Sequence, residues 1–264
     1  MSIPDEGYPL AAAVSPRLQV TETTDSTNAD LVKAVAADPE QWPHLSLILT
    51  TDQRAGRGRL DRTWTAPPGT ALAVSVLVRV DGLPVAARGW VPLVAGAAMT
   101  RAVRDQLRGT PHRVSVKWPN DVLLNGGKLS GILAEVVPGH PDAVVIGVGV
   151  NTRMSLADLP VETATSFAAS GLEVDDDRLL AAFLTELDAQ LTALLAAGGD
   201  AGAAGVAADI VALCSTVGSD VDVALPDGSH LVGRADGIDA EGRLVVVADG
   251  VPTPVAAGDV VHVR

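Results

Sequence analysis

The chain contains very little cysteine. Cys214 is the single cysteine among 264 residues, so no disulfide can form within the chain. The nearby residues Ile210, Val211 and Leu213 are apolar, which predicts a buried structural thiol on a helix. Because disulfide-free proteins are typical of reducing compartments, we expect the protein to be cytoplasmic.

Long apolar runs are also missing. No stretch reaches the roughly 18 uninterrupted apolar residues that suggest a membrane-spanning helix. Residues 1–16 carry neither the basic region nor the apolar region of a signal peptide. The sequence therefore predicts neither a membrane span nor export.

Several familiar site motifs are absent as well. The five histidines lack cysteine or acidic partners at the spacing of a zinc site: His44, His112, His140, His230 and His262. Gly56-Arg-Gly58 has neither the third glycine of a dinucleotide fingerprint nor the Lys-Ser/Thr of a P-loop. No Gly-x-Ser-x-Gly nucleophile elbow occurs. These absences argue against a zinc enzyme, both common nucleotide folds and a serine hydrolase.

Positive charge is scarce. The chain has 19 basic and 32 acidic residues and a formal net charge of −13, so no overall field attracts nucleic acid, and we expect no nucleic-acid partner. Only three of the 19 basic residues are lysines: Lys33, Lys117 and Lys128. A lysine kept in an arginine-rich chain suggests that a compact ammonium is needed there, and Lys117 and Lys128 both fall in the motifs below.

Arginine and glycine are instead concentrated in residues 53–64. The stretch holds Arg54, Arg57, Arg59 and Arg62, interleaved with Gly56 and Gly58. Glycine lets a backbone approach a ligand closely, and the arginine fork matches phosphate and carboxylate oxygens. The composition predicts a mobile loop that closes over an anion, with an ordinary solvated basic loop as the alternative.

The hydrophobic pattern predicts an α+β fold in two parts. Strand-like and helical runs follow one another up to about residue 216, and short strands separated by turns follow from residue 218, as in a small barrel. We expect a catalytic domain over residues 1–216 and a small barrel over residues 217–264. The expected strands of the first part are 17–23, 45–51, 70–80, 114–118, 121–125, 128–137 and 143–150, the last four as an antiparallel meander; its expected helices are 28–37, 89–107, 175–197 and 206–215.

Polar residues and glycines gather at the strand ends of this meander. Lys117-Trp-Pro-Asn-Asp121 ends one strand, Lys128 to Glu135 with Gly131 in its middle forms the next, and Gly147-Val-Gly-Val-Asn151 ends the strand after it. Glycine weakens a strand unless something must approach its backbone closely. Asn and Asp in turns often bond their own backbone, so a structural use remains open, but the convergence favours a shared site.

The start of the first long helix is a further candidate. Asp25-Ser26-Thr27-Asn28 precedes it, and Thr27 with Asp30 resembles a capping box. Such residues commonly cap a helix, while free N–H groups at a helix start can also hold a polar ligand head.

Taken together, these motifs resemble, in order and spacing, those of the biotin protein ligases. The residues that carry the resemblance are Asp25 to Asn28, Gln53 to Trp64, Lys117 to Asp121, Lys128 to Glu135 and Gly149 to Asn151. It implies a mixed, largely antiparallel sheet covered by helices, of the class II synthetase-like type, followed by an SH3-like barrel. It also implies that ATP and Mg²⁺ serve to couple biotin to one lysine of the biotin carboxyl carrier domain of acyl-CoA carboxylases.

Some members of that family carry an N-terminal winged helix and repress transcription. Here about sixteen residues precede the first expected strand, so we expect the short form without a DNA-binding domain.

The resemblance assigns roles residue by residue. The biotin-binding residues would be Ser26, Thr27, Asn28, Gln53, Gly56, Arg57, Gly58, Arg59, Lys128, Gly131 and Leu133. The nucleotide-binding residues would be Arg59, Trp64, Lys117, Asn120 and Asn151, and the catalytic cations Lys128, Arg57 and Lys117. No protein metal ligand is assigned, although Asp121 could be one.

One departure from the family pattern concerns the loop. Leu60-Asp61 stands where many relatives have a basic residue and a glycine, which leaves the closing geometry of the loop open. A lipoate or octanoate ligase is the nearest alternative enzyme, and an inactive biotin-sensing module is an alternative from another class. We expect a monomer or a weak homodimer.

Overall fold

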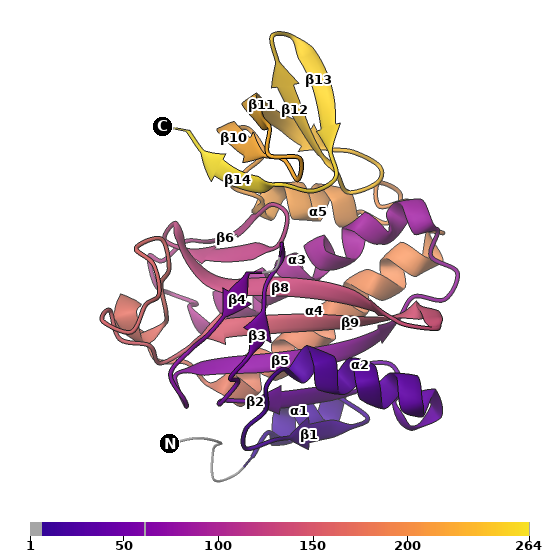
Figure 1. Ribbon diagram of the computed structural model, residues 1–264, viewed down its shortest axis with the longest axis vertical. Helices are drawn as coiled ribbons and strands as arrows, with labels where there is room; N and C mark the ends of the chain where they lie inside the picture. Colours follow the sequence, from indigo (N-terminus) through magenta and orange to yellow (C-terminus); the bar gives the residue numbers. More distant parts are fainter. Residues whose placement is uncertain (1–6, 61, 264) are drawn as a thin grey trace.

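The computed structural model describes residues 7–60 and 62–263, and over these ranges the larger sheet has seven strands. Their order is β1 (Leu18–Val20), β2 (Leu47–Thr50), β5 (Ala71–Arg79), β9 (His140–Asn151), β8 (Gly127–Val137), β7 (Asp121–Leu124) and β6 (Val114–Lys117). β1 pairs parallel with β2, and every other neighbouring pair is antiparallel. The expected mixed sheet and the meander from β6 to β9 are confirmed (Figure 1).

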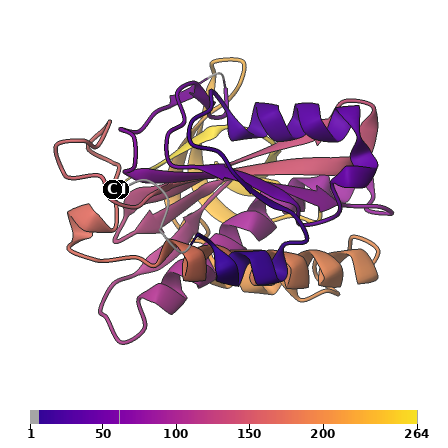
Figure 2. The same cartoon turned by 90° about the horizontal axis from the view of Figure 1, so that it is seen from below.

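Helices cover both faces of this sheet. α2 (Thr27–Ala37) lies on one face, while α1 (Pro9–Val14), α3 (Trp90–Gln106) and α4 (Asp176–Ala196) form a layer on the other (Figure 2). α5 (Val206–Leu213) follows near the smaller sheet, and short 3₁₀ turns are η1 (Pro39–Gln41), η2 (Val85–Gly89) and η3 (Ala168–Ser170). Side chains alternate along a strand, so odd-numbered residues of β5 and β9 face α2 and even-numbered ones face α3.

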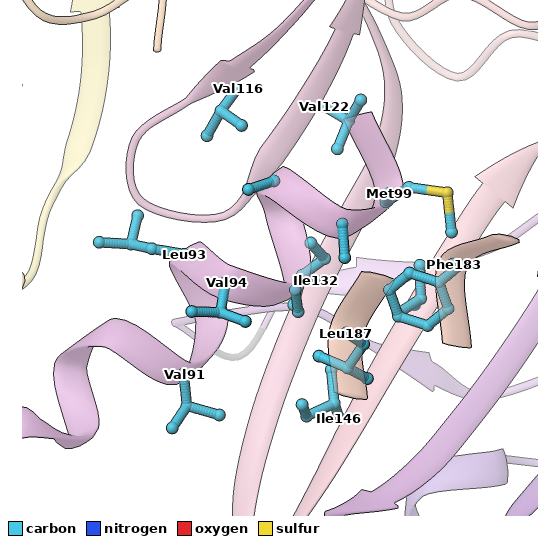
Figure 3. Packing of buried hydrophobic residues seen from close by; sticks show 14 of the residues in the cluster. Val91, Leu93, Val94, Met99, Val116, Val122, Ile132, Ile146, Phe183 and Leu187 are labelled. Atoms are coloured by element: carbon cyan, nitrogen blue, oxygen red, sulfur yellow. The ribbon is translucent and has the colours of Figure 1, made fainter. Parts of the chain in front are cut away.

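The main hydrophobic core lies between the sheet and the layer of α3 and α4. Figure 3 shows valine, leucine and methionine of α3 meeting the even face of the sheet, with Phe183 and Leu187 of α4 behind them. α4 is long and apolar enough to cross a membrane by length and composition alone. Its leucines are buried in this core and its first turn carries Asp176 and Asp177, so it is a core helix here.

The sequence pattern did not predict α1. Pro9 occupies its first turn, where a missing N–H costs nothing, and the Asp177 carboxylate accepts hydrogen bonds from the backbone N–H groups of Leu10 (2.9 Å) and Ala11 (2.8 Å). A six-residue helix has little stability of its own. Its partner lies 166 residues away from Ala11 in sequence, beyond the reach of a local pattern.

The C-terminal residues form a separate small sheet. Its described strands are β10 (Asp220–Ala224), β11 (His230–Ile238), β12 (Leu244–Ala248), β13 (Val251–Val255) and β14 (Asp259–His262), antiparallel in the order β13-β12-β11-β10-β14. This is the small SH3-like architecture that the resemblance implied.

A turn of the small sheet docks on the larger domain. The indole N–H of Trp90 donates to the Ala240 carbonyl (2.9 Å), and that of Trp118 donates to the Gly242 carbonyl (3.2 Å). A Cβ on Gly242 would lie 2.8 Å from the carbonyl carbon of Gly89, so the two backbones can meet only without a side chain. The docking fixes how the small sheet faces the strand ends of β6 and β7.

Candidate active site

A cleft opens on the α2 face of the larger sheet. It lies between the start of α2, the strand ends of β7 and β8, and the loop before β14, with about 910 Å³ of empty space counted out to open solvent. Most of the residues predicted from the sequence line it: Ser26, Thr27, Asn28, Gln53, Arg57, Gly58, Arg59, Trp64, Asn120, Asp121, Lys128, Gly131 and Leu133.

The start of α2 forms the polar end of the cleft. Ser26 is the N-cap, since its hydroxyl accepts a hydrogen bond from the Ala29 N–H (3.4 Å). The predicted capping box with Thr27 as the cap is therefore wrong, and Asp30 instead accepts a hydrogen bond from the Thr24 hydroxyl (2.5 Å). Thr27 is thus free to face the cleft, where its backbone N–H donates to Gln53 Oε1 (2.9 Å).

The glycines of β9 make room for side chains that enter the cleft. A Cβ at Gly147 would overlap Asn28 Oδ1, and one at Gly149 would lie 2.7 Å from the Trp64 indole. Both glycines are on the odd face of β9, which looks toward α2. The mid-strand glycines therefore admit protein side chains as well as leaving space for a ligand.

Lys128 and Asp121 form an ion pair at the other end of the cleft, with Nζ 2.7 Å from Oδ1. A bulge places Lys128 there: Val122 pairs with Ser130 but Leu123 pairs with Lys128, so β8 has one extra residue. In a regular strand residues 128 and 131 would face opposite sides, and the bulge turns Lys128 back over Gly131. A Cβ at Gly131 would meet Lys128 Cε at 3.2 Å, so the glycine gives the lysine its space.

The arginine-rich stretch folds as a short hairpin over the cleft. β3 (Gly56–Arg57) pairs antiparallel with β4 (Thr63–Trp64), and both cross in front of the sheet in Figure 1. We call residues 54–60 and 62–64 the lid. A Cβ on Gly56 would overlap Gln53 Nε2, so this position has no room for a side chain. Asp61, the departure noted in the sequence, lies outside the described residues.

The tip of the lid contacts the C-terminal sheet. Arg59 Nη1 donates to Asn120 Oδ1 (3.1 Å) and to the Gly258 carbonyl (3.4 Å), and Arg62 Nη2 donates to Asp259 Oδ2 (2.7 Å). The hydrogen bond from Arg62 lowers the pKa of Asp259, and burial lowers the pKa of Arg59. The loop before β14 is therefore part of the wall of the cleft.

Three predicted residues do not line the cleft: Gly56, Lys117 and Asn151. Lys117 pairs with Asp121 in the β6–β7 register, and its charge helps to lower the pKa of Asp259. The Asn151 amide is buried and donates to the Thr165 carbonyl (2.9 Å), which holds the segment after β9 against β8. This contact of Asn151 is structural, and its role at the nucleotide stays a prediction.

Other cleft residues were missed by the sequence reasoning. Gly258 and Asp259 come from the small sheet, and no motif marks them. Two further residues contact the cleft wall without lining the cleft: Ser75 is fully buried against Thr27 and Asn28, and Glu135, noted in a motif without a role, accepts a hydrogen bond from Asn28. Ser75 could have been suspected because it is the one hydroxyl in the otherwise apolar run 71–78.

The described residues contain no group of three or more His, Cys, Asp or Glu side chains that could hold a metal ion. Asp121 and Asp259 line the cleft, and each already pairs with a cation. This donor set suits Mg²⁺ that arrives on phosphate oxygens, because Mg²⁺ is usually held by one or two carboxylates together with substrate phosphates and water.

Comparison with known proteins gives consistent matches. The model of the biotin/lipoate A/B protein ligase family matches residues 20–151, and that of the biotin protein ligase C terminal domain matches residues 216–263. The chain is 39% identical over 249 residues to a biotin--[acetyl-CoA-carboxylase] ligase of Mycobacterium tuberculosis, covering 94% of this chain and 90% of the relative. It is 32% identical over 245 residues to the bifunctional ligase/repressor BirA of Escherichia coli, covering 91% and 72%.

A solved structure shares the fold. The biotin protein ligase from Aquifex aeolicus in complex with biotin and ATP matches with a TM-score of 0.75 at 22% identity, covering 94% of this chain and 99% of that one.

Proposed function

This chain belongs to the biotin/lipoate A/B protein ligase family and is a biotin protein ligase, and from that membership we propose how its cleft activates and transfers biotin. Biotin and ATP are the substrates, biotinyl-5′-AMP is the intermediate, and a lysine of a biotin carboxyl carrier domain is the acceptor. The observation that carries the proposal is the Lys128–Asp121 pair at one end of a cleft whose other end is the polar start of α2.

The start of α2 fits the biotin head. A ureido group offers one carbonyl acceptor and two N–H donors, and the hydroxyls of Ser26 and Thr27 and the amide of Gln53 supply both kinds of partner. Ser26 and Thr27 are buried, so hydrogen bonds to them are formed away from water and discriminate against a fatty acid that lacks the ureido group. We infer that Gly131 and Leu133 flank the acyl chain between this end and Lys128.

The activation step brings two anions together. A biotin carboxylate oxygen attacks the α-phosphorus of ATP, a new C–O–P bond forms, and pyrophosphate leaves. Lys128 and Arg57 line the cleft and supply fixed positive charge for this step, and Lys117 adds to the field from beside Asp121. Mg²⁺ carried on the phosphates would neutralise further charge, and Asp121 is the residue that would help to hold it.

The transfer step requires a dry site. The acceptor amine attacks the acyl carbon of the mixed anhydride, AMP leaves with the C–O bonding electrons, and the amine loses a proton. Water would compete as a nucleophile, so the lid must stay closed until the carrier lysine arrives. Arg59, Arg62 and Trp64 place lid residues against Gly258, Asp259 and β9, and we propose that this arrangement keeps water out.

We further propose a division of labour along the chain. Residues 1–216 would bind biotin and ATP, and residues 217–264 would complete the wall through the loop before β14. We place the enzyme in the cytoplasm, in keeping with its one free, buried cysteine, as a monomer or weak homodimer; sedimentation at several concentrations measures the oligomeric state.

The proposal is tested by two assays on the purified chain. With biotin and ATP but no acceptor, pyrophosphate should be released in one turnover per enzyme, and adding a biotin carboxyl carrier domain should give continued release and a biotinylated lysine. Absence of biotin-dependent pyrophosphate release would contradict the proposal. Biotin binding without release would instead identify a sensing module, and faster turnover with octanoate or lipoate would identify the other branch of the family.

A further inference from the structure

The Glu135 carboxylate is held from two sides. Its Oε1 accepts a hydrogen bond from Arg57 Nη2 (3.2 Å), and its Oε2 accepts one from Asn28 Nδ2 (2.7 Å). Arg57 belongs to the lid and Asn28 to the first turn of α2, while Glu135 stands on β8 between them. One carboxylate therefore touches both the lid and the polar end of the cleft.

Asn28 has no freedom to turn away from this contact. Its side chain is buried, its Nδ2 also donates to the Leu133 carbonyl (3.3 Å), and its Oδ1 accepts a hydrogen bond from the Ser75 hydroxyl (2.5 Å). Its amide also fills the space that a Cβ at Gly147 would need, so it packs directly on the backbone of β9. Since a carboxylate and a carbonyl only accept, the amide nitrogen must face Glu135 and the amide oxygen must face Ser75.

The orientation of Asn28 fixes the hydrogens at the start of α2. Ser75 has one hydroxyl hydrogen and lies within hydrogen-bonding distance of both Asn28 Oδ1 and Thr27 Oγ1 (2.8 Å). Since Ser75 has one hydrogen to share between these two acceptors, the Thr27 hydroxyl can donate either to Ser75 or to Gln53 Oε1 (3.1 Å), to which the Thr27 N–H also donates. Holding the Ser75 hydrogen on Asn28 Oδ1 favours the first arrangement, and displacing Asn28 favours the second.

We propose that Glu135 is a positioning residue that links lid closure to the pocket for the biotin head, through Arg57 on one side and Asn28 on the other. This inference deepens the proposed function and rests on it. A closed lid holds Glu135 in place, Glu135 orients Asn28, and Asn28 sets the donors and acceptors that Thr27 and Gln53 present to the ureido group. By linkage, bound biotin must favour the closed lid by the same factor.

The solvent exposure of Arg57 and Glu135 sets the expected size of the coupling between the lid and the biotin pocket. The side chains of Arg57 and Glu135 are 55% and 28% exposed, and ion pairs of that kind contribute little, so lid and pocket should be coupled by about fivefold or less. The bond from buried Asn28 to the carboxylate is charge-assisted and stronger, and its loss should weaken biotin binding about tenfold.

A reciprocal exchange tests this chain of contacts. In Glu135→Gln one of the two acceptors becomes an N–H₂ group, so either Asn28 or Arg57 faces a donor, and in Asn28→Asp a carboxylate faces the carboxylate of Glu135. In the double variant the new amide nitrogen at position 135 donates to the new carboxylate at position 28. That carboxylate also accepts from Ser75, and the new amide oxygen at position 135 accepts from Arg57. The contacts among Arg57, position 135, position 28 and Ser75 therefore return with the polarity between positions 28 and 135 reversed, and only the weaker bond from position 28 to the Leu133 carbonyl (3.3 Å) is lost. Glu40→Gln, at an exposed glutamate of η1, is the matched control.

Two measurements decide the outcome, both without ATP. Calorimetry gives the biotin dissociation constant, and limited proteolysis gives the protection of the lid on adding biotin. We expect each single variant to bind biotin about tenfold more weakly and to lose the biotin-dependent protection, and the double variant to recover both to within about threefold. A double variant no better than the weaker single variant, or single variants within about twofold of wild type, would overturn the inference.

Folding and the family function are checked separately. Circular dichroism melts establish that each variant is folded, and should Asn28→Asp not fold, Glu135→Gln and Glu135→Ala carry the test because both remove a partner of Arg57 or Asn28. Wild-type protein that binds no biotin would contradict the proposed function itself. Biotin binding with variants that behave as wild type would contradict only the role of Glu135.

Discussion

Replacing Lys128 by alanine removes the cation at the reacting end of the cleft. Its Nζ lies 2.7 Å from Asp121 Oδ1 and over the backbone of Gly131, and its side chain is 42% exposed. Two unit charges about 4 Å apart at an effective dielectric constant of about 20 interact by about 4 kcal/mol. We therefore expect Lys128→Ala to slow biotin-dependent pyrophosphate release about 10³-fold, at about 1.4 kcal/mol per tenfold.

The effect on folding should be much smaller. The substitution leaves Asp121 without its ion-pair partner, but an ion pair with a half-exposed lysine contributes about 1 kcal/mol or less. For a chain of this length that lowers the melting temperature by about 2–4 °C. Loss of the chemical step and retention of the fold are thus separable.

The assay is single-turnover release of pyrophosphate at saturating biotin and ATP. Lys33→Ala, on the exposed side of α2, is the matched control and should behave as wild type. Lys128→Arg keeps the charge but replaces a compact ammonium by a planar fork over Gly131, so we expect partial recovery. Release by a folded Lys128→Ala enzyme within about tenfold of wild type would refute the electrostatic reasoning, and full activity of Lys128→Arg would refute the need for an ammonium.

Three further outcomes are expected. Gly149→Val should displace the Trp64 indole, from which its Cβ would be 2.7 Å, and raise the KM for ATP about tenfold with little effect on biotin binding measured by calorimetry. Asp259→Ala removes the partner of Arg62 and should speed hydrolysis of enzyme-bound biotinyl-adenylate severalfold, as followed by chromatography of the quenched intermediate. Burial, and to a smaller extent the charge of Lys117, lowers the pKa of His262 below 6.5 in the folded protein. As the pH drops through 6.5 the unfolded chain therefore binds the proton before the folded one does, and the stability of the fold decreases. His262→Gln should flatten this decline in melting temperature with falling pH.

Much of the fold could be predicted because each core element carries its own pattern. β5 and most of β9 are apolar, valine-rich runs bounded by turn residues, and α3 and α4 repeat apolar residues at helical spacing. Asn125-Gly126 between two strand-like runs is typical of a two-residue hairpin turn, and both residues have the positive φ (50° and 87°) that such a turn requires. Elements stabilised by distant partners, such as α1 on Asp177, were not predictable in this way.

The features of the cleft also fall into those that a local sequence pattern predicts and those that depend on distant contacts. Motifs on single segments predicted Gln53, Arg57, Lys128 and Gly131 as site residues. Glycine is unusual within a strand, and an arginine-rich stretch is unusual in an acidic chain, so both kinds of motif stand out locally. Nothing local indicated that a bulge at Leu129 of β8 would turn Lys128 over Gly131, since strand alternation alone places residues 128 and 131 on opposite faces. A one-residue shift in pairing thus decides whether the cation reaches the cleft, and pairing is a tertiary property.

The lid itself depends on tertiary contacts at both of its ends. At its base, Gly56 packs against the Gln53 side chain and has no room for a side chain of its own. At its tip, Arg59 and Arg62 donate hydrogen bonds to Gly258 and Asp259 of the small sheet. Arginine can make these tip contacts only if the small sheet docks at one position, and the turn at residues 240–242 provides that position through the indoles of two tryptophans. The closed arrangement of the cleft is therefore a property of both parts of the chain, although the motifs that identify it lie almost entirely in the first.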